Sequence, residues 1–485
     1  MAGTHQKLHA IMIAYPLQGH INPFVNLAMK LASKGFTITF VHTQHIHHQI
    51  TQSQSQTHTT TEQHDIFAGA RNSGLDIRYT TITDGLPLEF DRSSNFVQYW
   101  ECILEDFQTH VDEYVGRMVK SDPSSAYFLI ADTFFAWPAT VAEKYNLVNV
   151  SFWTEPALVF TLNYHLDLLI ENGHFASHDN RKDTIDYIPG VQAIEPKDLM
   201  STLQKTDIST LVHRVIFKAF EQVKKADIVT CNTVQELESE TISALQQKLP
   251  TYAIGPIFPL GFTKSIVDTN LWSESECTRW LDTKPHGSVL YVSFGSLANI
   301  SEHDFMEIAH GLLLSGVTFV WVVRPGIVNL EGDNNLPDRF KDVIGDQGLI
   351  VPWCCQIEVI SHSAIGGFLT HCGWNSILES MWCGVPLICF PVVYDQITNR
   401  KLVVDDWRIG INLCDKKSIT REEVVEKINS LMRGNTSSNE LRKEMKKVKK
   451  TLENALDIDG SSEKNFEQFI KKVKELIGKR NGLEI

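Results

Sequence analysis

The sequence predicts an α/β protein with two Rossmann-like domains, each a doubly wound parallel sheet, that face each other across a cleft. Short apolar strands alternate with amphipathic helices in two successive runs. An irregular stretch with prolines and a glycine separates the two runs after residue 255. The chain of 485 residues is also too long for a single hydrophobic core.

The first run predicts an N-terminal domain over residues 1–255. Continuous apolar segments, typical of strands buried on both faces, occupy residues 8–15, 36–41, 127–131 and 149–152. Asn22 and Pro23 are a favourable N-cap and first helical residue, so they predict where the first helix begins. The polar, low-complexity residues 50–64 are expected to form a surface loop.

The second run predicts a C-terminal domain over residues 271–460, joined to the first by a linker at residues 256–270. Its expected strands are residues 288–294, 318–323, 365–370 and 387–390. Ligands of doubly wound sheets bind at the carboxyl ends of the strands, so a site is expected where the two domains face each other.

Composition and short motifs exclude several classes of function. The net charge of −14 argues against a nucleic-acid partner, because an acidic chain repels phosphate backbones. The nine scattered cysteines favour reduced thiols in a cytoplasmic protein. No apolar run approaches the roughly 18 residues of a membrane span. A monomer is the simplest expectation for the oligomeric state. Neither a Gly-x-Gly-x-x-Gly motif after the first strand nor a P-loop is present, which disfavours nicotinamide dehydrogenases and P-loop enzymes.

Residues 353–396 carry the most specific signal in the chain. They read WCCQIEVISHSAIGGFLTHCGWNSILESMWCGVPLICFPVVYDQ. Over its whole length this segment resembles the 44-residue sugar-nucleotide box of plant small-molecule UDP-glycosyltransferases, a family with the two-domain GT-B fold. The match departs from the family at Cys354-Cys355, where Ala-Pro is usual.

Three further segments resemble the same family. Residues 16–20 (PLQGH) are similar to its N-terminal histidine loop, and residues 293–296 (SFGS) to the loop after the first strand of its second domain. The latter similarity implies that Ser296 binds the UDP-sugar. Residues 460–462 (GSS) resemble the turn before its last helix, so residues 461–485 are expected to form a helix that packs back on the N-terminal domain. The resemblance implies a UDP-sugar co-substrate, an apolar small-molecule acceptor, and no metal or other cofactor.

The chemistry of the box also follows from its residues. His371 ends a predicted strand, and Gly373 permits a tight turn there. Asn375 and Ser376 precede the next predicted helix, whose free N–H groups and partial positive charge suit a diphosphate. Both side chains add donors, and a nitrogen of His371 can donate to a phosphate oxygen. No metal is needed where such donors meet the leaving diphosphate.

The resemblance assigns the nucleoside end of the box. Trp353 is expected to stack on the uracil ring rather than to serve as core. Backbone groups of Cys354 would read the edge of the base, and Gln356 would lie near the ribose. Glu379 is expected to bond both ribose hydroxyls. Alternatively it forms a capping box with Ser376, because Ser-x-x-Glu is the signature of that motif.

The resemblance also assigns the sugar end. Trp374, Asp395 and Gln396 are expected to face the sugar, where a carboxylate and an amide can bond adjacent hydroxyls. In this family a closing glutamine is associated with glucose, so Gln396 favours UDP-glucose as the donor.

A catalytic base is predicted on the other side of the cleft. His20 follows the first strand, and an imidazole with a pKa of about 6.5 can remove a proton at neutral pH. Asp132, at the end of a neighbouring strand, would orient the ring, and both residues match the family's catalytic pair. The alternatives are a histidine packed on the helix end and a solvent-facing aspartate. The predicted reaction is one displacement that inverts the donor's α-linkage and gives a β-glucoside of a hydroxyl or carboxyl group.

Several features leave alternatives open. A catalytically silent UDP-sugar-binding protein would share the box, and an epimerase would use no acceptor. Aromatic residues near strand ends are expected to contribute to an apolar acceptor pocket, although each is singly more often a core residue: Trp100, Phe134, Phe135, Trp137, Trp153 and Phe160. A polar loop, rather than a metal site, is expected for His42, His45, His47 and His48. Asp457-Ile458-Asp459 is expected to be a turn.

Overall fold

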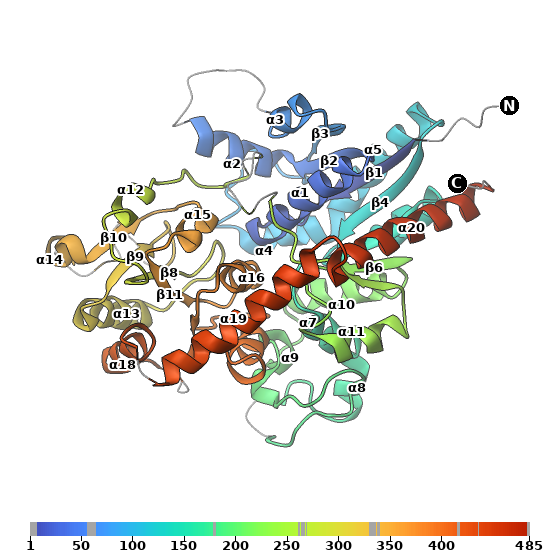
Figure 1. Ribbon diagram of the computed structural model, residues 1–485. Coiled ribbons are helices and arrows are strands. Elements are labelled where there is room, and N and C mark those ends of the chain that lie inside the picture. Colours follow the sequence, from blue (N-terminus) through green and yellow to red (C-terminus); the bar gives the residue numbers. More distant parts are fainter. Residues whose placement is uncertain are drawn as a thin grey trace.

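Two all-parallel sheets form the frame of the molecule (Figure 1). The computed structural model describes residues 7–55, 65–177, 181–259, 262, 267, 269–328, 336, 340–414, 418–434 and 436–482. Within these ranges the first sheet has seven strands in the order β3-β2-β1-β4-β5-β6-β7, and the second has six in the order β10-β9-β8-β11-β12-β13. The prediction of two doubly wound parallel sheets is confirmed.

The strands of both sheets are short, and those in the middle of each sheet are buried, as expected when helices cover both faces. The first sheet contains β1 (Leu8–Ile13), β2 (Thr37–Thr43), β3 (Ile77–Ile82), β4 (Ala126–Asp132), β5 (Val148–Trp153), β6 (Ile228–Cys231) and β7 (Thr251–Ala253). The second contains β8 (Val289–Ser293), β9 (Thr318–Val322), β10 (Gly348–Val351), β11 (Ile365–Thr370), β12 (Leu387–Cys389) and β13 (Gly410–Asn412). Every residue of β2 and of β4 is buried.

Helices connect the strands and follow the second sheet to the C-terminus. The first half contains α1 (Gln18–Ser33), α2 (Gln44–Ser55), α3 (Ala68–Asn72), α4 (Phe96–Glu101), α5 (Phe107–Ser121), α6 (Pro138–Lys144), α7 (Ala157–Tyr164), α8 (Leu166–Glu171), α9 (Ser201–Gln204), α10 (Leu211–Val223) and α11 (Ser239–Gln246). The second half contains α12 (Thr278–Leu281), α13 (Glu302–Ser315), α14 (Phe340–Ile344), α15 (Gln356–Ser361), α16 (Trp374–Cys383), α17 (Gln396–Lys401), α18 (Arg421–Met432), α19 (Thr436–Leu456) and α20 (Ser461–Asn481).

Each sheet has a point where the chain switches from one side of the first strand to the other. In the first sheet this point lies between β1 and β4, with Ile13 opposite Ala131. In the second sheet it lies between β8 and β11, with Ser293 opposite Thr370. Loops that leave two such strands diverge, so each switch point opens a crevice at the carboxyl edge of its sheet.

The last helix, α20, runs back along the first sheet (Figure 1). Phe466 and Phe469 are buried in the same apolar cluster as the core residues of β1 and β2. Arg480 forms an ion pair with Asp227 at 2.7 Å. The predicted domain boundaries stay predictions. Residues 260–261, 263–266 and 268 of the predicted linker, and residues 483–485, lie outside the described residues.

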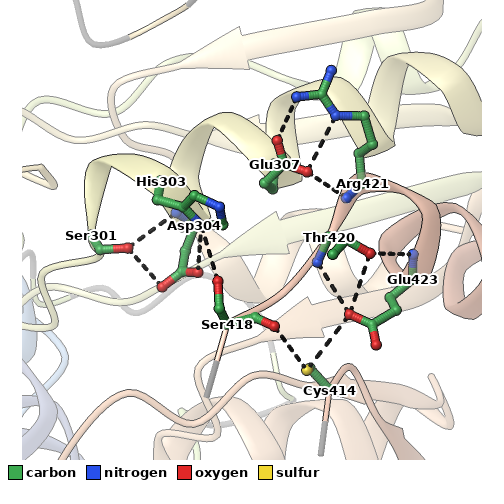
Figure 2. A network of polar contacts seen from close by, with 9 residues as sticks. All are labelled: Ser301, His303, Asp304, Glu307, Cys414, Ser418, Thr420, Arg421 and Glu423. Atoms are coloured by element: carbon green, nitrogen blue, oxygen red, sulfur yellow. Dashed lines mark hydrogen bonds and ion pairs between the residues drawn. The ribbon is translucent and has the colours of Figure 1, made fainter. Parts of the chain in front are cut away.

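Polar contacts join α13 and α18 on the second sheet (Figure 2). The hydroxyl of Ser301 caps α13, and Thr420 forms a capping box with Glu423 at the start of α18. Glu307 of α13 accepts a hydrogen bond of 2.6 Å from the backbone N–H of Arg421. These bonds satisfy N–H groups that the first turn of a helix leaves without intrahelical partners. The bond between Glu307 and Arg421 joins the two helices, and none of these contacts includes a residue of the predicted site.

Two local predictions are wrong. Helix α1 begins at Gln18 rather than after Asn22, and Pro23 lies inside it. Residues 50–55 of the predicted loop belong to α2, whereas residues 56–64 lie outside the described residues. An apolar contact decides the second case, because Ile46 and Ile50 of α2 are buried against the first sheet.

The histidine cluster is therefore part of a strand and a helix, not of a loop. His42 lies on β2, and His45, His47 and His48 lie on α2. Within the described ranges there is no group of three or more residues able to hold a metal ion. No helix among the described residues has both the length and the apolar character needed to cross a membrane. Asp457–Asp459 does form the turn between α19 and α20.

Candidate active site

The two switch points bring the predicted site residues together. His20 follows β1 and Asp132 ends β4, so both belong to the switch point of the first sheet. Ser296 follows β8 and His371 follows β11, at the switch point of the second sheet. Residues distant in sequence thus meet because parallel strands end at the same edge.

His20 and Asp132 form a buried pair. The Nδ1 atom of His20 lies 2.8 Å from Oδ2 of Asp132 and 3.1 Å from the hydroxyl of Thr154. Asp132 is only 1% exposed, and its Oδ1 accepts a hydrogen bond from the backbone of Phe134 at 3.0 Å. Because a carboxylate only accepts, it fixes the proton of His20 on Nδ1 and leaves Nε2 to act as a base. The alternative of a solvent-facing aspartate is therefore wrong, whereas His20 lies buried in the first turn of α1 and its role as a base stays a prediction.

A contact with the other sheet explains why α1 tolerates Pro23 in its interior. Pro23 has no N–H, so it cannot bond the carbonyl of Gly19 four residues before it. That carbonyl instead accepts a hydrogen bond of 2.7 Å from the side-chain amide of Asn375, which lies in the first turn of α16. The proline is therefore tolerated inside the helix, and the freed carbonyl joins the two switch points directly.

Two cavities meet at this junction. The first has a volume of about 230 Å³ and the second about 220 Å³. The first is lined by Ser296, Trp353, Cys354, Gln356, His371, Gly373, Trp374, Asn375, Ser376 and Glu379 among others. The second is lined by His20, Glu155, Asp395 and Gln396 together with apolar residues. Residues lining both cavities are Gly19, Ser296, His371, Gly373, Trp374 and Asn375, so the second cavity opens onto the first beside His20.

His371 stands at the boundary between the cavities. Burial lowers its pKa to about 4, so the ring is neutral at neutral pH and one of its nitrogens carries a proton to donate. The imidazole fits between two glycines. A Cβ on Gly295 would lie 2.4 Å from its Nε2, and a Cβ on Gly373 would lie 2.5 Å from it. These glycines let the backbone approach the ring closely.

A second network surrounds Glu379. The amide of Gln356 donates to Glu379 at 2.8 Å and to the hydroxyl of Ser376 at 3.0 Å. Burial raises the pKa of Glu379 to about 7. Helix α16 begins at Trp374 after Gly373, so Ser376 is its third residue rather than its N-cap. The capping-box alternative is therefore wrong, and Glu379 points into the first cavity.

Comparisons with known proteins identify the family. The family model described as "UDP-glucoronosyl and UDP-glucosyl transferase" matches residues 176–446, more than half of the chain. The chain belongs to this family. It is a glycosyltransferase, and the silent-binder and epimerase alternatives find no support in these matches.

Relatives of this glycosyltransferase match along its whole length. It is 58% identical to "UDP-glycosyltransferase 86A1" of Arabidopsis thaliana, over 99% of this chain and 98% of that protein. It is 35% identical to "7-deoxyloganetin glucosyltransferase" of Gardenia jasminoides, over 96% and 97% of the two chains. Its structure is similar to that of a UDP-glucose:anthocyanidin 3-O-glucosyltransferase in complex with UDP, with a TM-score of 0.81, 25% identity, and 97% and 99% coverage. The glycosyltransferase has the GT-B fold.

The residues predicted to bind the nucleoside include aromatic and sulfur side chains. Trp353 lies 4.7 Å from Trp272, centroid to centroid, and lines the first cavity instead of being core. Cys354 is buried, and its sulfur lies 3.6 Å from the hydroxyl of Tyr291. Cys355 precedes α15 as its N-cap residue in an extended conformation. The backbone at Cys355 is thus extended, although this chain has Cys-Cys where the family usually has Ala-Pro.

The residues predicted to face the sugar all line the second cavity, but each also forms hydrogen bonds with other residues of the protein. The indole N–H of Trp374 donates to the carbonyl of Asn232 at 2.7 Å. The side-chain oxygen of Gln396 accepts from the backbone N–H groups of Val392 and Val393, at 2.9 and 3.0 Å. Its amide nitrogen is therefore the group that a ligand would meet. Burial raises the pKa of Asp395 to about 6.

The aromatic prediction is correct in part. Trp100 and Phe134 line the second cavity, where Tyr15 stacks on Trp100 with ring centroids 5.1 Å apart. The other four aromatic residues of the prediction lie in the core instead: Phe135, Trp137, Trp153 and Phe160. Trp153 ends β5, whereas Trp137 precedes α6 and Phe160 lies within α7.

Sequence reasoning missed several polar residues that line the cavities, among them Gln18, Thr154 and Glu155. Gln18 lines the first cavity, and Thr154 and Glu155 line the second. The signal for Thr154 and Glu155 was their place directly after β5, next to the strand that ends in Asp132. All nine cysteines lie in the described ranges, and none of them forms a disulfide.

Proposed function

We propose that this glycosyltransferase moves glucose from UDP-glucose to a hydroxyl group of an apolar small molecule. The observation that supports this most is the buried pair of His20 and Asp132, which faces a largely apolar cavity open to a second cavity with diphosphate-binding character. The acceptor would occupy the cavity beside His20, and UDP the cavity that contains Trp353 and Glu379.

The proposed reaction is a single displacement at the anomeric carbon. His20 Nε2 takes the proton of the acceptor hydroxyl, and Asp132 stabilises the imidazolium that forms. The acceptor oxygen attacks from the face opposite UDP, so an α-linked donor gives a β-glucoside. Charge that builds on the diphosphate meets the N-terminus of α16, the side chains of Asn375 and Ser376, and the N–H of His371.

The lining of the cavities favours a neutral donor sugar. The family includes glucuronosyl and glucosyl transferases, and a glucuronate would bring a carboxylate into the second cavity. Among the described residues that line either cavity there is no lysine or arginine to pair with it, whereas Glu155 and Asp395 are both present. Gln396 also favours glucose as the donor sugar, as do the names of the glucosyltransferase relatives.

The acceptor cavity favours an apolar ligand such as a phenolic, flavonoid or terpenoid. Its apolar lining consists of Tyr15, Leu17, Phe96, Trp100, Phe134, Met200, Leu211, Val212, Val215, Ile216, Leu297 and Ala298. We further infer a monomer that works in the cytoplasm without a metal. One chain supplies every proposed site residue, none of the nine cysteines forms a disulfide, and neutral donors face the diphosphate position.

An acceptor screen tests the proposal. Purified protein is incubated with UDP-glucose and a panel of phenolic and terpenoid alcohols, and products are scored by the mass gain of one hexose. His20→Ala is expected to lower kcat by at least about 1,000-fold while the Kd of UDP stays within about twofold. His303→Ala, on the exposed start of α13, is the matched control. Full turnover by His20→Ala, or an α-linked product, would contradict the mechanism.

A further inference from the structure

Glu155 is a half-buried acidic residue that the proposed mechanism does not use. It is the second residue after β5, directly after Thr154, whose hydroxyl contacts His20. It lines the second cavity together with Asp395 and Gln396, which belong to the other half of the chain. The first sheet thus places a carboxyl group at the end of the cavity where the sugar is proposed to bind.

One oxygen of this carboxyl group is left unsatisfied. Oε2 of Glu155 is buried and has no hydrogen-bond partner in the described part of the chain. Glu238, another buried glutamate of the same half, accepts bonds from the N–H groups of Ala157 and Leu158, at 3.0 and 2.8 Å, and from the hydroxyl of Thr233. Buried polar atoms are rarely left without a partner, because an unmade hydrogen bond costs the full desolvation of the group. Protein groups therefore supply the hydrogen bonds of the Glu238 carboxylate, whereas Oε2 of Glu155 is available to a ligand.

The surroundings of this carboxyl group favour its neutral form. Burial, and the nearby charges of Asp395 and Asp132, raise the pKa of Glu155 well above its ordinary value. The positively ionisable group on this side is His20, which is already paired with Asp132. A protonated carboxyl both donates and accepts, which suits a hydroxyl group.

We propose that Glu155 binds a hydroxyl group of the donor sugar from the side opposite Asp395, so that both halves of the chain hold the same sugar. The aromatic residues, Tyr15 and Trp100 among them, provide the apolar surface for the acceptor, whereas Glu155 shares its surroundings with Asp395 and Gln396. This inference rests on the proposed function, because it takes UDP-glucose as the donor. Glu155 acts as a specificity-determining residue that recognises the sugar and not the nucleotide.

Binding measurements without an acceptor test the inference. Calorimetry gives the Kd of UDP-glucose and of UDP for the wild type, Glu155→Met, which keeps the volume but removes the polar atoms, and Glu155→Gln, which still donates and accepts. Glu155→Met is expected to weaken UDP-glucose about 10-fold to 100-fold and to leave UDP within about twofold. Glu155→Gln is expected to stay within about threefold of the wild type for both ligands. Glu143→Ala, at an exposed glutamate of α6, is the control.

Two other outcomes decide against the inference. An equal loss for UDP and UDP-glucose in Glu155→Met would indicate a structural role. An unchanged Kd of UDP-glucose, with or without a raised KM for an acceptor, would remove Glu155 from the donor site. If Glu155→Met does not give a cooperative thermal transition, the same criteria apply to Glu155→Ala. Wild-type protein that binds UDP-glucose but transfers no hexose to any acceptor would contradict the proposed function and leave this inference standing.

Discussion

Replacing Gly295 with alanine is expected to displace the imidazole of His371 from the boundary between the two cavities. The new Cβ would lie 2.4 Å from Nε2 and 2.6 Å from Cε1 of that ring. Ordinary contact begins near 3.4 Å, so the ring must move by about 1 Å. A shift of about 1 Å in a group that faces the reacting diphosphate costs on the order of 100-fold in rate. We therefore expect kcat/KM for UDP-glucose to fall about 100-fold and UDP binding to weaken.

A control separates this effect from the cost of the backbone. Gly295 has φ +70°, which costs alanine roughly 1 kcal/mol of folding free energy wherever it occurs. Gly287, just before β8, has φ +65°, and no atom lies within 4 Å of a Cβ built there. Gly287→Ala should lose the same stability and keep normal kinetics. Denaturant unfolding, UDP calorimetry and steady-state kinetics compare the two variants. Equal kinetics for both would refute a role of the His371 position in catalysis.

Three further predictions concern carboxyl groups. Asp132→Asn should lower kcat roughly 1,000-fold and leave the Kd of UDP unchanged, because the amide no longer fixes the proton on the imidazole; a loss under tenfold in steady-state assays would contradict this. Glu379 has a pKa raised to about 7, so its accepting carboxylate is lost as the pH falls through that value. The KM for UDP-glucose should therefore rise up to about fivefold between about pH 7 and pH 6, and Glu379→Gln should show a KM that does not vary with pH over this range. Glu238→Leu should lower the free energy of unfolding by roughly 2 to 4 kcal/mol in urea titrations, because the N–H groups at the start of α7 lose their acceptor; unchanged stability would show that water replaces it.

Local sequence patterns predicted the elements better than their ends. The strands that carry the site begin and end within about two residues of the apolar segments, because burial on both faces of a parallel sheet requires such runs. The start of α1 was missed because the residues around Pro23 have the local pattern of a helix start. The helix can begin before Pro23 because Asn375, more than 300 residues away in sequence, donates a hydrogen bond to the carbonyl of Gly19 that the proline leaves free.

The sequence by itself determined the fold class and the family, and it predicted the candidate site, since the strand-end loops carry residue types whose chemistry is specific: an imidazole, an aspartate and donors for a diphosphate. Only the tertiary structure decided which polar groups already form hydrogen bonds within the protein and which are available to ligands. Gln356 and Gln396 are partly occupied by protein partners, whereas Glu155 keeps a buried oxygen without one in the described part of the chain. The physical reason is that hydrogen-bond satisfaction and burial depend on neighbours from other strands and from the other sheet, and no local pattern contains them.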